Sequence, residues 1–161
     1  MPGVPSLGPR GEGWVVIQGI VLWWIVATGW AFPVGVASAP PPVVGAAGVA
    51  LMAAGLVLAA AGVQALASHD AFTTLPRPRD GARLVQDGVF RLVRNPVYGG
   101  VLITALGWAI LRGSAAALAG VAVLFLVFDL KRRREEAWLV ERFPEYAAYR
   151  SRTRRLIPWI Y

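Results

Sequence analysis

The chain contains no cysteine and a single histidine, His69. Without thiolates it can form neither disulfides nor cysteine-ligated metal sites, and one imidazole argues against a histidine-rich metal centre, so we expect no bound metal. Charge is also missing over a long stretch, since residues 13–68 include no Asp, Glu, Lys or Arg. These 56 residues are enough for two bilayer crossings of roughly 20 residues each.

The composition of the whole chain is that of a membrane protein. Of its 161 residues, 57% are hydrophobic and only 16% are charged, and the mean hydropathy is +0.56. A soluble domain of this length needs more charge to cover its surface. The net charge of +7 then indicates loops beside anionic membrane lipids, and we expect no nucleic-acid partner.

Four apolar segments predict an all-α, polytopic membrane protein with four transmembrane helices. The expected spans cover residues 14–32, 43–67, 97–111 and 115–130. The last two are short for independent spans, and only residues 112–114 separate them, which predicts a tight helical hairpin. The Gly- and Ala-rich second span predicts close packing against another helix. Trp23 and Trp24 lie too deep in the first span for an interfacial belt, so we expect both to pack against a neighbouring helix.

The positive charges predict the orientation in the membrane. Fifteen of the sixteen Lys and Arg residues lie outside the spans on one side, and Arg112 alone lies on the other. The positive-inside rule therefore places both termini in the cytoplasm, and we expect the protein in a bacterial inner membrane. Residues 137–149 mix aromatic and charged side chains and are interrupted at Pro144, which predicts a C-terminal amphipathic helix at the interface. The loop of residues 68–95 and this tail should then meet on one face.

The residues before the third span form a pattern that could bind an anion. Asn95 is a good N-cap and Pro96 suits the first helical position, so a helix should begin here with free backbone amides. Arg91 and Arg94 add positive charge, and two glycines at 99 and 100 leave room for something to lie against the helix. A capped helix flanked by arginines is also an ordinary feature of a cytoplasmic membrane edge, so both interpretations stay open.

Two consecutive carboxylates, Glu135 and Glu136, follow the fourth span. A carboxylate can accept hydrogen bonds from both hydroxyls of a sugar, although next to four cations the pair can equally be a solvated charge run. Asp129, near the end of the fourth span, is expected to form a salt bridge with a neighbouring arginine. For His69 and Asp70 we favour a structural role.

These features occur together in a recognisable order. The chain reads Leu-Val-x-x-Gly-x-Phe-Arg-x-Val-Arg-Asn-Pro-x-Tyr over residues 84–98, then a helical hairpin, Glu-Glu at 135–136, Phe-Pro-Glu-Tyr-x-x-Tyr at 143–149 and Ile-Pro at 157–158. This pattern resembles the isoprenylcysteine carboxyl methyltransferase family and the related membrane phospholipid methyltransferases. The resemblance implies one membrane domain, residues 1–161, with two scaffold spans in residues 13–67 and a methyltransferase core in residues 68–161.

The resemblance also implies a cofactor and a site. S-adenosylmethionine would be the methyl donor, in a cytoplasmic pocket that a lipidic acceptor enters from the bilayer. Lys131 would contact the acceptor, and Glu136 or Tyr98 would act as base if the acceptor is an amine or a hydroxyl. The residues expected to bind the cofactor are Arg83, Leu84, Val85, Phe90, Arg94, Asn95, Pro96, Val97, Tyr98 and Glu135.

Departures from the family pattern leave the substrate open. The carboxyl-methylating branch usually has histidine at the position of Asn95, whereas asparagine occurs there in the phospholipid branch. Lys131 stands where arginine is more usual. The acceptor could therefore be a prenylcysteine-like carboxylate or a lipid amine. A non-catalytic membrane scaffold that keeps this fold is the main alternative, whereas a transporter is disfavoured because the spans show no inverted repeat. The sequence does not define an oligomeric state.

Overall fold

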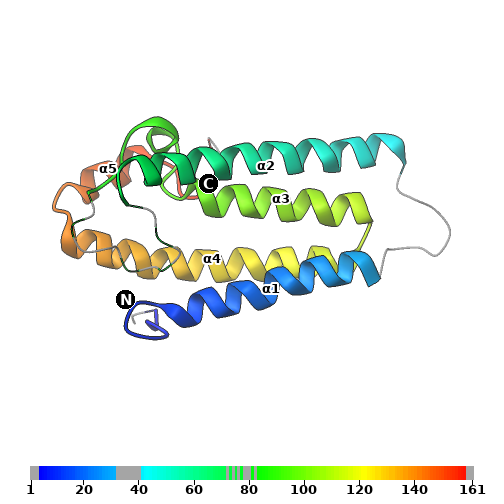
Figure 1. The fold of residues 1–161 in the computed structure, drawn as a ribbon, viewed down its shortest axis with the longest axis horizontal. Coiled ribbons are helices and arrows are strands. Elements are labelled where there is room, and N and C mark those ends of the chain that lie inside the picture. The colour runs from blue at the N-terminus through cyan, green and yellow to red at the C-terminus, as the bar shows by residue number, and fades with distance from the viewer. Residues whose placement is uncertain are drawn as a thin grey trace.

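The computed structural model describes residues 4–31, 41–71, 73, 75, 77, 81 and 83–158, and its regular structure within these residues is entirely helical (Figure 1). This confirms the predicted all-α class. The elements are α1 (Glu12–Ala31), α2 (Pro42–Ser68), the 3-10 helix η1 (Gly88–Arg91), α3 (Pro96–Arg112), α4 (Ala115–Arg142) and α5 (Tyr146–Arg152).

The four long helices run side by side in two pairs. Helix α2 packs along α3, and α1 packs along α4, while α3 and α4 hold the two pairs together. Helices η1 and α5 lie at the same end of this bundle, so the loop before α3 and the tail after α4 meet there as the sequence predicts (Figure 1). The end of the bundle with η1 and α5 therefore combines segments that are far apart in the chain.

Two of the helices are long and apolar enough to cross a membrane, namely α1 with 20 residues and α2 with 27 residues. Their bounds agree with the first two predicted spans. Helix α3 is a shorter apolar helix of 17 residues. Helix α4 has 28 residues, but its apolar part ends at Leu130 and the helix continues through a run of charged residues. The polar extension explains why α4 is much longer than the segment predicted from hydropathy.

The pairing of α2 with α3 depends on glycine, as predicted. Gly48, Gly55 and Gly62 are the buried residues of α2 and recur every seven residues along one face. A Cβ atom on Gly48 would lie only 2.9 Å from the carbonyl oxygen of Gly107 on α3. The two backbones are thus in direct contact, which is how helices without large interface side chains gain dispersion energy in lipid.

The predicted hairpin between α3 and α4 is confirmed. Gly113 ends α3 in the left-handed conformation, with φ of 57°, where a residue without Cβ is favoured. Ser114 caps α4 by accepting a hydrogen bond from the Ala117 amide at 3.2 Å, and its hydroxyl donates to the Thr28 carbonyl of α1 at 3.1 Å. The turn therefore joins three helices at the end of the bundle away from α5.

The prediction for the two tryptophans of α1 is wrong for Trp23. Its side chain is 70% exposed, because α1 contacts α4 with the face that carries Ile25, Thr28 and Gly29. Trp24 lies at the edge of this contact and donates a hydrogen bond to the Ala116 carbonyl at 3.4 Å. Trp23 therefore belongs to the outer surface of the bundle.

The tail differs from the predicted interfacial helix. Residues 137–142 complete α4, the helix ends before Pro144, and α5 is a separate helix of seven residues. Tyr146 and Tyr149 are each 2% exposed, so the aromatic side chains expected at the membrane interface pack inside the protein. After α5 the chain returns to the loop before α3, where the Arg94 amide donates to the Arg154 carbonyl at 2.8 Å.

The start of α3 is where the sequence places it, but the predicted cap is not formed. The Asn95 side chain makes no capping hydrogen bond within the helix and instead donates through Nδ2 to the Arg155 carbonyl at 3.0 Å. The space beside the two glycines is also filled by the protein itself. Gly99 lies against the backbone of Leu156, and Gly100 lies against that of Ala59 on α2.

Candidate active site

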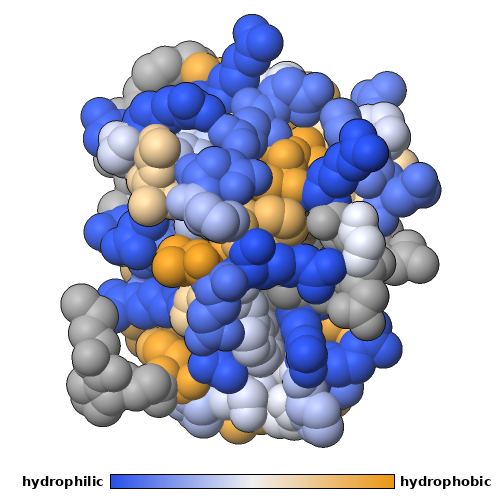
Figure 2. Space-filling view, turned by 90° about the vertical axis from the view of Figure 1, so that its left-hand side faces the viewer, coloured by the Kyte–Doolittle hydropathy of each residue, from blue (hydrophilic) through white to orange (hydrophobic). Residues whose placement is uncertain are grey.

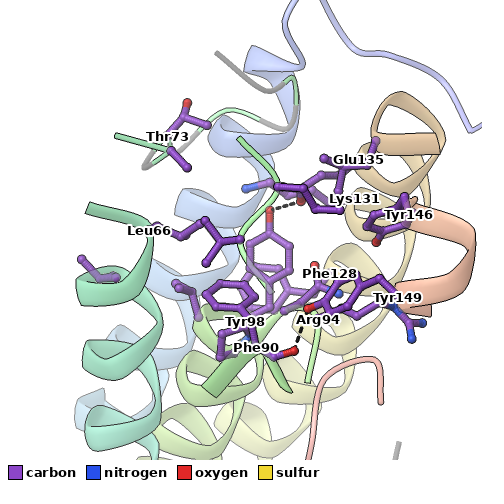
Figure 3. A pocket seen from close by; sticks show the side chains of 18 of the residues that line it. Leu66, Thr73, Phe90, Arg94, Tyr98, Phe128, Lys131, Glu135, Tyr146 and Tyr149 are labelled. Atoms are coloured by element: carbon purple, nitrogen blue, oxygen red, sulfur yellow. Dashed lines mark hydrogen bonds between the residues drawn. The ribbon is translucent and has the colours of Figure 1, made fainter. Parts of the chain in front are cut away.

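A pocket opens at the end of the bundle that carries η1 and α5. Its cavity volume is about 210 Å³, and the pocket is partly open to the surface. The walls come from all four long helices, from described residues of the segment between α2 and α3, and from the tail (Figure 3). The sequence-predicted residues that line the pocket are Arg83, Leu84, Val85, Phe90, Arg94, Asn95, Pro96, Val97, Tyr98, Lys131 and Glu135.

The polar centre of this pocket joins α3 to α4. The Tyr98 hydroxyl donates a hydrogen bond to Glu135 Oε2 at 2.9 Å, and Lys131 lies beside the same carboxylate in Figure 3. The Lys131 Nζ lies 4.9 Å from the centre of the Tyr98 ring, within the range of a cation–π contact. Phe128 stacks on the Tyr98 ring, with ring centres 4.8 Å apart. Lys131 and Glu135 are four residues apart, so both project from one face of α4.

Burial changes the protonation of the two charged residues in this cluster. It raises the pKa of Glu135 to about 7, and the neighbouring Lys131 ammonium and the Tyr98 hydrogen bond only partly oppose this effect. Burial also lowers the pKa of Lys131, while the Glu135 charge acts in the other direction. The pocket thus contains a carboxyl group that gains or loses its proton near neutral pH.

One wall of the pocket is apolar. Val85 and Phe90 are each 6% exposed and pack with Tyr146 and Tyr149 in one hydrophobic cluster that also includes Leu84. The Tyr149 hydroxyl donates to the Phe90 carbonyl at 2.8 Å, as the dashed line in Figure 3 shows. This wall can hold a flat aromatic group such as a purine base by stacking and van der Waals contact.

The amino end of α3 borders the pocket. The amides of Val97 and Tyr98 belong to the first turn, where a helix offers no carbonyl partner, and the helix dipole favours an anion there. Arg83 is exposed and lines the same pocket. A carboxylate could therefore bind between the helix start and this guanidinium.

Arg94 and Glu136 have a different environment from the one expected. Arg94 Nε donates to Glu136 Oε1 at 3.1 Å, and the two side chains are only 4% and 6% exposed. The Arg94 guanidinium also donates to the carbonyls of Arg150 at 3.0 Å and Thr153 at 2.6 Å. Arg132 is a further cation on Glu136, with Nη1 3.5 Å from Oε1.

These contacts change the interpretation of both residues. Arg94 holds the tail in place, so Arg83 is the better candidate to bind an anionic ligand. Glu136 does not line the pocket, and a base must lie within hydrogen-bond reach of the proton that it removes. Its position does not favour the predicted role as a base. The predicted salt bridge of Asp129 is confirmed, because its carboxylate pairs with Arg132 and, at 2.7 Å, with Arg133.

Sequence reasoning missed several residues of the pocket. Tyr146 and Tyr149 line it together with Leu139 and Phe143. The aromatic residues of the Phe-Pro-Glu-Tyr-x-x-Tyr motif were the available signal, but an amphipathic interfacial helix explained them equally well. The two apolar helices assigned to the scaffold also contribute, with Gln18 from α1 and both Val63 and Leu66 from α2. Their positions could not be inferred without knowing how these helices pack.

The surface around this end of the bundle is mostly hydrophilic, with apolar patches between the polar side chains (Figure 2). Its exposed basic residues include Arg142, Arg150, Arg152, Arg154 and Arg155. His69 lies outside the pocket, with Nε2 3.5 Å from Asp87 Oδ2. A polar face at one end of long apolar helices is typical of a membrane protein.

Comparison with known proteins gives the family. The profile of the phospholipid methyltransferase family matches residues 43–146, and the chain belongs to this family. It is 37% identical over 100 residues to the protein-S-isoprenylcysteine O-methyltransferase of Schizosaccharomyces pombe, a match that covers 61% of this chain and 42% of that protein. It is 35% identical over 81 residues to the cobalt-zinc-cadmium resistance protein CzcN of Cupriavidus metallidurans, covering 50% of this chain and 38% of that protein.

The chain thus spans about two-fifths of the length of these curated relatives. No solved structure matches it significantly. The family match begins in α2, so α1 lies outside the segment that the profile covers.

Proposed function

We propose that the protein is an integral membrane methyltransferase that uses S-adenosylmethionine to methylate a lipidic acceptor. The observation that carries this proposal is the meeting of three distant parts of the family motif in one pocket. It is lined by nine residues of the segment 83–98, by the α4 pair Lys131 and Glu135, and by the α5 pair Tyr146 and Tyr149. A site assembled from such separated segments requires the whole core to fold as one unit.

The proposal includes four membrane crossings. Helices α1 and α2 would cross completely, and α3 with the apolar part of α4 would form the two shorter crossings. The polar extension of α4 then lies outside the bilayer with η1 and α5. Both chain termini would be in the cytoplasm of a bacterial cell, and the exposed arginines of this face would contact anionic lipids of the inner membrane.

The residues of the pocket fit the chemical groups of S-adenosylmethionine. Glu135 is a carboxylate that can accept hydrogen bonds from both ribose hydroxyls. The apolar wall around Val85 and Phe90 suits adenine. The amides of Val97 and Tyr98, with Arg83, suit the carboxylate of the methionine part.

When bound, this cofactor would supply a methyl group activated by a positive sulfur. The carbon–sulfur bond of the cofactor would be the bond that methyl transfer to the acceptor replaces. The protein mainly has to hold the acceptor in line with that bond, which orientation by Lys131 and the pocket walls would achieve. A carboxylate acceptor needs no base, whereas an amine releases a proton that Glu135, with its pKa of about 7, could take through Tyr98 or water.

Both acceptor classes have support. The name of the Schizosaccharomyces pombe relative refers to O-methylation of isoprenylcysteine, and the name of the matching family refers to phospholipids. In either case the acceptor is lipidic, which agrees with a pocket whose walls include membrane-crossing helices. Its entry from the bilayer is part of the proposal.

Calorimetric titration of S-adenosylmethionine into the purified protein in nanodiscs tests the donor site. The Tyr98→Ala and Glu135→Ala variants should each weaken binding by roughly 10–100-fold, the effect of losing a hydrogen bond to a charged group. Glu141→Ala is the matched control, because Glu141 lies on the same helix but is exposed. Unchanged affinity in both pocket variants would overturn the assignment, and absence of binding to the unmodified protein would favour a non-catalytic scaffold.

A further inference from the structure

Gln18 is a polar residue in the first half of the largely apolar helix α1, and it lines the pocket. Its side-chain oxygen accepts a hydrogen bond from Lys131 Nζ at 2.7 Å. A partly buried amide costs free energy unless it has a partner, and Lys131 supplies that partner from a distant part of the chain.

The chemistry of the two groups fixes how the amide is oriented. An ammonium group can only donate hydrogen bonds, so the oxygen of Gln18 has to face Lys131. The amide nitrogen of Gln18 then keeps two N–H donors that make no hydrogen bond within the part of the chain that the structure describes. Gln18 and Lys131 therefore present donors of both side chains at one pocket wall.

An amide partner adds no negative charge beside Lys131. The Lys131 side chain is 1% exposed and already lies beside the Glu135 carboxylate, so a carboxylate at position 18 would be a second negative charge next to the same ammonium. Gln18 instead accepts one hydrogen bond from the ammonium and leaves the local charge unchanged. The face of the Tyr98 ring, 4.9 Å from Nζ, likewise stabilises the cation while carrying no net charge.

We propose that Gln18 is a positioning residue that holds Lys131 and adds its own N–H donors, so that the pair recognises an anionic head group of the acceptor. A carboxylate fits two adjacent donor groups, one of them charged. This inference rests on the proposed function and names the acceptor class that the site selects. It also makes α1, which lies outside the segment matched by the family profile, part of the active site.

The test compares two acceptor probes that differ only in charge, N-acetyl-S-farnesylcysteine and its primary carboxamide. Their binding to the full-length protein is measured by calorimetry in phosphatidylcholine nanodiscs, which add no anionic lipid. The unmodified protein should prefer the carboxylate by at least about tenfold, the effect of one charge-assisted hydrogen bond. Gln18→Leu should lose most of this preference, and the exposed α1 variant Trp23→Leu should keep it.

A second variant keeps the hydrogen bond to Lys131. Gln18→Glu has nearly the same shape as the native residue but adds a second carboxylate beside the ammonium, so it should bind the carboxylate probe more weakly than Gln18→Leu does while the carboxamide is little affected. A merely structural role for Gln18 would change the affinities for both probes equally. That result, or a wild-type preference retained in Gln18→Leu and Gln18→Glu, would overturn the proposal, as would absence of any preference in the unmodified protein.

Titration of S-adenosylmethionine on the same samples separates this inference from the proposed function. No cofactor binding by the unmodified protein would overturn the donor assignment. Cofactor affinity within about twofold of the unmodified protein, together with a lost carboxylate preference in Gln18→Leu, would confirm that Gln18 acts on the acceptor.

Discussion

The two consecutive glutamates of α4 should have opposite roles, and this difference can be measured. Glu135 lines the pocket and accepts a hydrogen bond from Tyr98, whereas Glu136 lies in the buried ion network with Arg94 and Arg132. We therefore expect Glu136→Gln to lower stability and leave cofactor affinity largely intact. Glu135→Gln should lower cofactor affinity and leave the fold at least as stable as before.

The stability effect at position 136 follows from burial. Both side chains of the Arg94–Glu136 pair are less than one-tenth exposed, at 4% and 6%. Removing one partner of a buried ion pair costs roughly 3–5 kcal/mol, because the remaining charge is left without compensation. For a chain of this size, about 1 kcal/mol shifts the unfolding midpoint by roughly 2–4 °C. Glu136→Gln should therefore lower the midpoint by about 6–20 °C.

At position 135 the expected effect of the substitution on stability has the opposite sign. Because the pKa of Glu135 is raised from 4.5 to about 7, the folded state keeps its proton where the unfolded chain has lost it. This residue therefore lowers the stability of the fold progressively as the pH rises from about 4.5 to 7, and the loss is complete above pH 7. The full shift corresponds to roughly 3 kcal/mol. At pH 8, Glu135→Gln should thus be as stable as the unmodified protein or more stable by up to that amount.

Thermal unfolding and calorimetric titration of S-adenosylmethionine on the same nanodisc samples at pH 8 measure both effects. Glu141→Gln, the same substitution at an exposed position of α4, should change neither. The reasoning is refuted if Glu136→Gln loses cofactor affinity at an unchanged midpoint. It is also refuted if Glu135→Gln unfolds at a markedly lower temperature and binds the cofactor normally.

Two further predictions follow from the packing and from the pKa. A Cβ atom on Gly100 would lie 2.5 Å from the Ala59 amide nitrogen, so Gly100→Ala should destabilise the protein by about 1–3 kcal/mol. Gly19 has open space around it, so Gly19→Ala should be neutral or stabilising by up to about 1 kcal/mol. Thermal unfolding measures the difference between the two variants. Cofactor affinity should rise between pH 6 and pH 8 as Glu135 ionises with its pKa of about 7, since the carboxylate is the better acceptor for hydroxyls. Titrations over this range should show no such rise for Glu135→Gln.

Hydropathy and small residues predicted the helices well because these patterns depend on each segment alone. The apolar runs gave the bounds of α1 and α2 within about two residues, an ordinary uncertainty for helix ends. Residues 112–114 predicted the hairpin because a glycine in the left-handed conformation is a local requirement. The deep position of Trp23, in contrast, did not reveal its direction, since only the packing of α1 on α4 determines which face is buried.

The tail was harder to predict because its environment is formed by distant residues. Tyr146 and Tyr149 have the spacing of an amphipathic helix, and nothing local shows that they pack over Phe90 instead of lipid. The Asn95 side chain has the chemistry of an N-cap, but the Arg155 carbonyl takes its hydrogen bond. In both cases a partner about sixty residues away in sequence determines the contact.

The geometry of α4 explains how one helix can serve the pocket and the ion network at once. Residues 128, 131 and 135 follow the three- and four-residue spacing that keeps side chains on one face, and all three line the pocket. Residues 129, 132 and 136 repeat the same spacing one position later, and all three belong to the buried charges. A rotation of about 100° per residue therefore separates the two sets. The Glu-Glu pair joins a ligand-facing carboxylate to one that holds Arg94 and, through it, the tail. Shifting either glutamate by one position would move its carboxylate out of its own environment, which gives a physical reason for two acidic residues in succession.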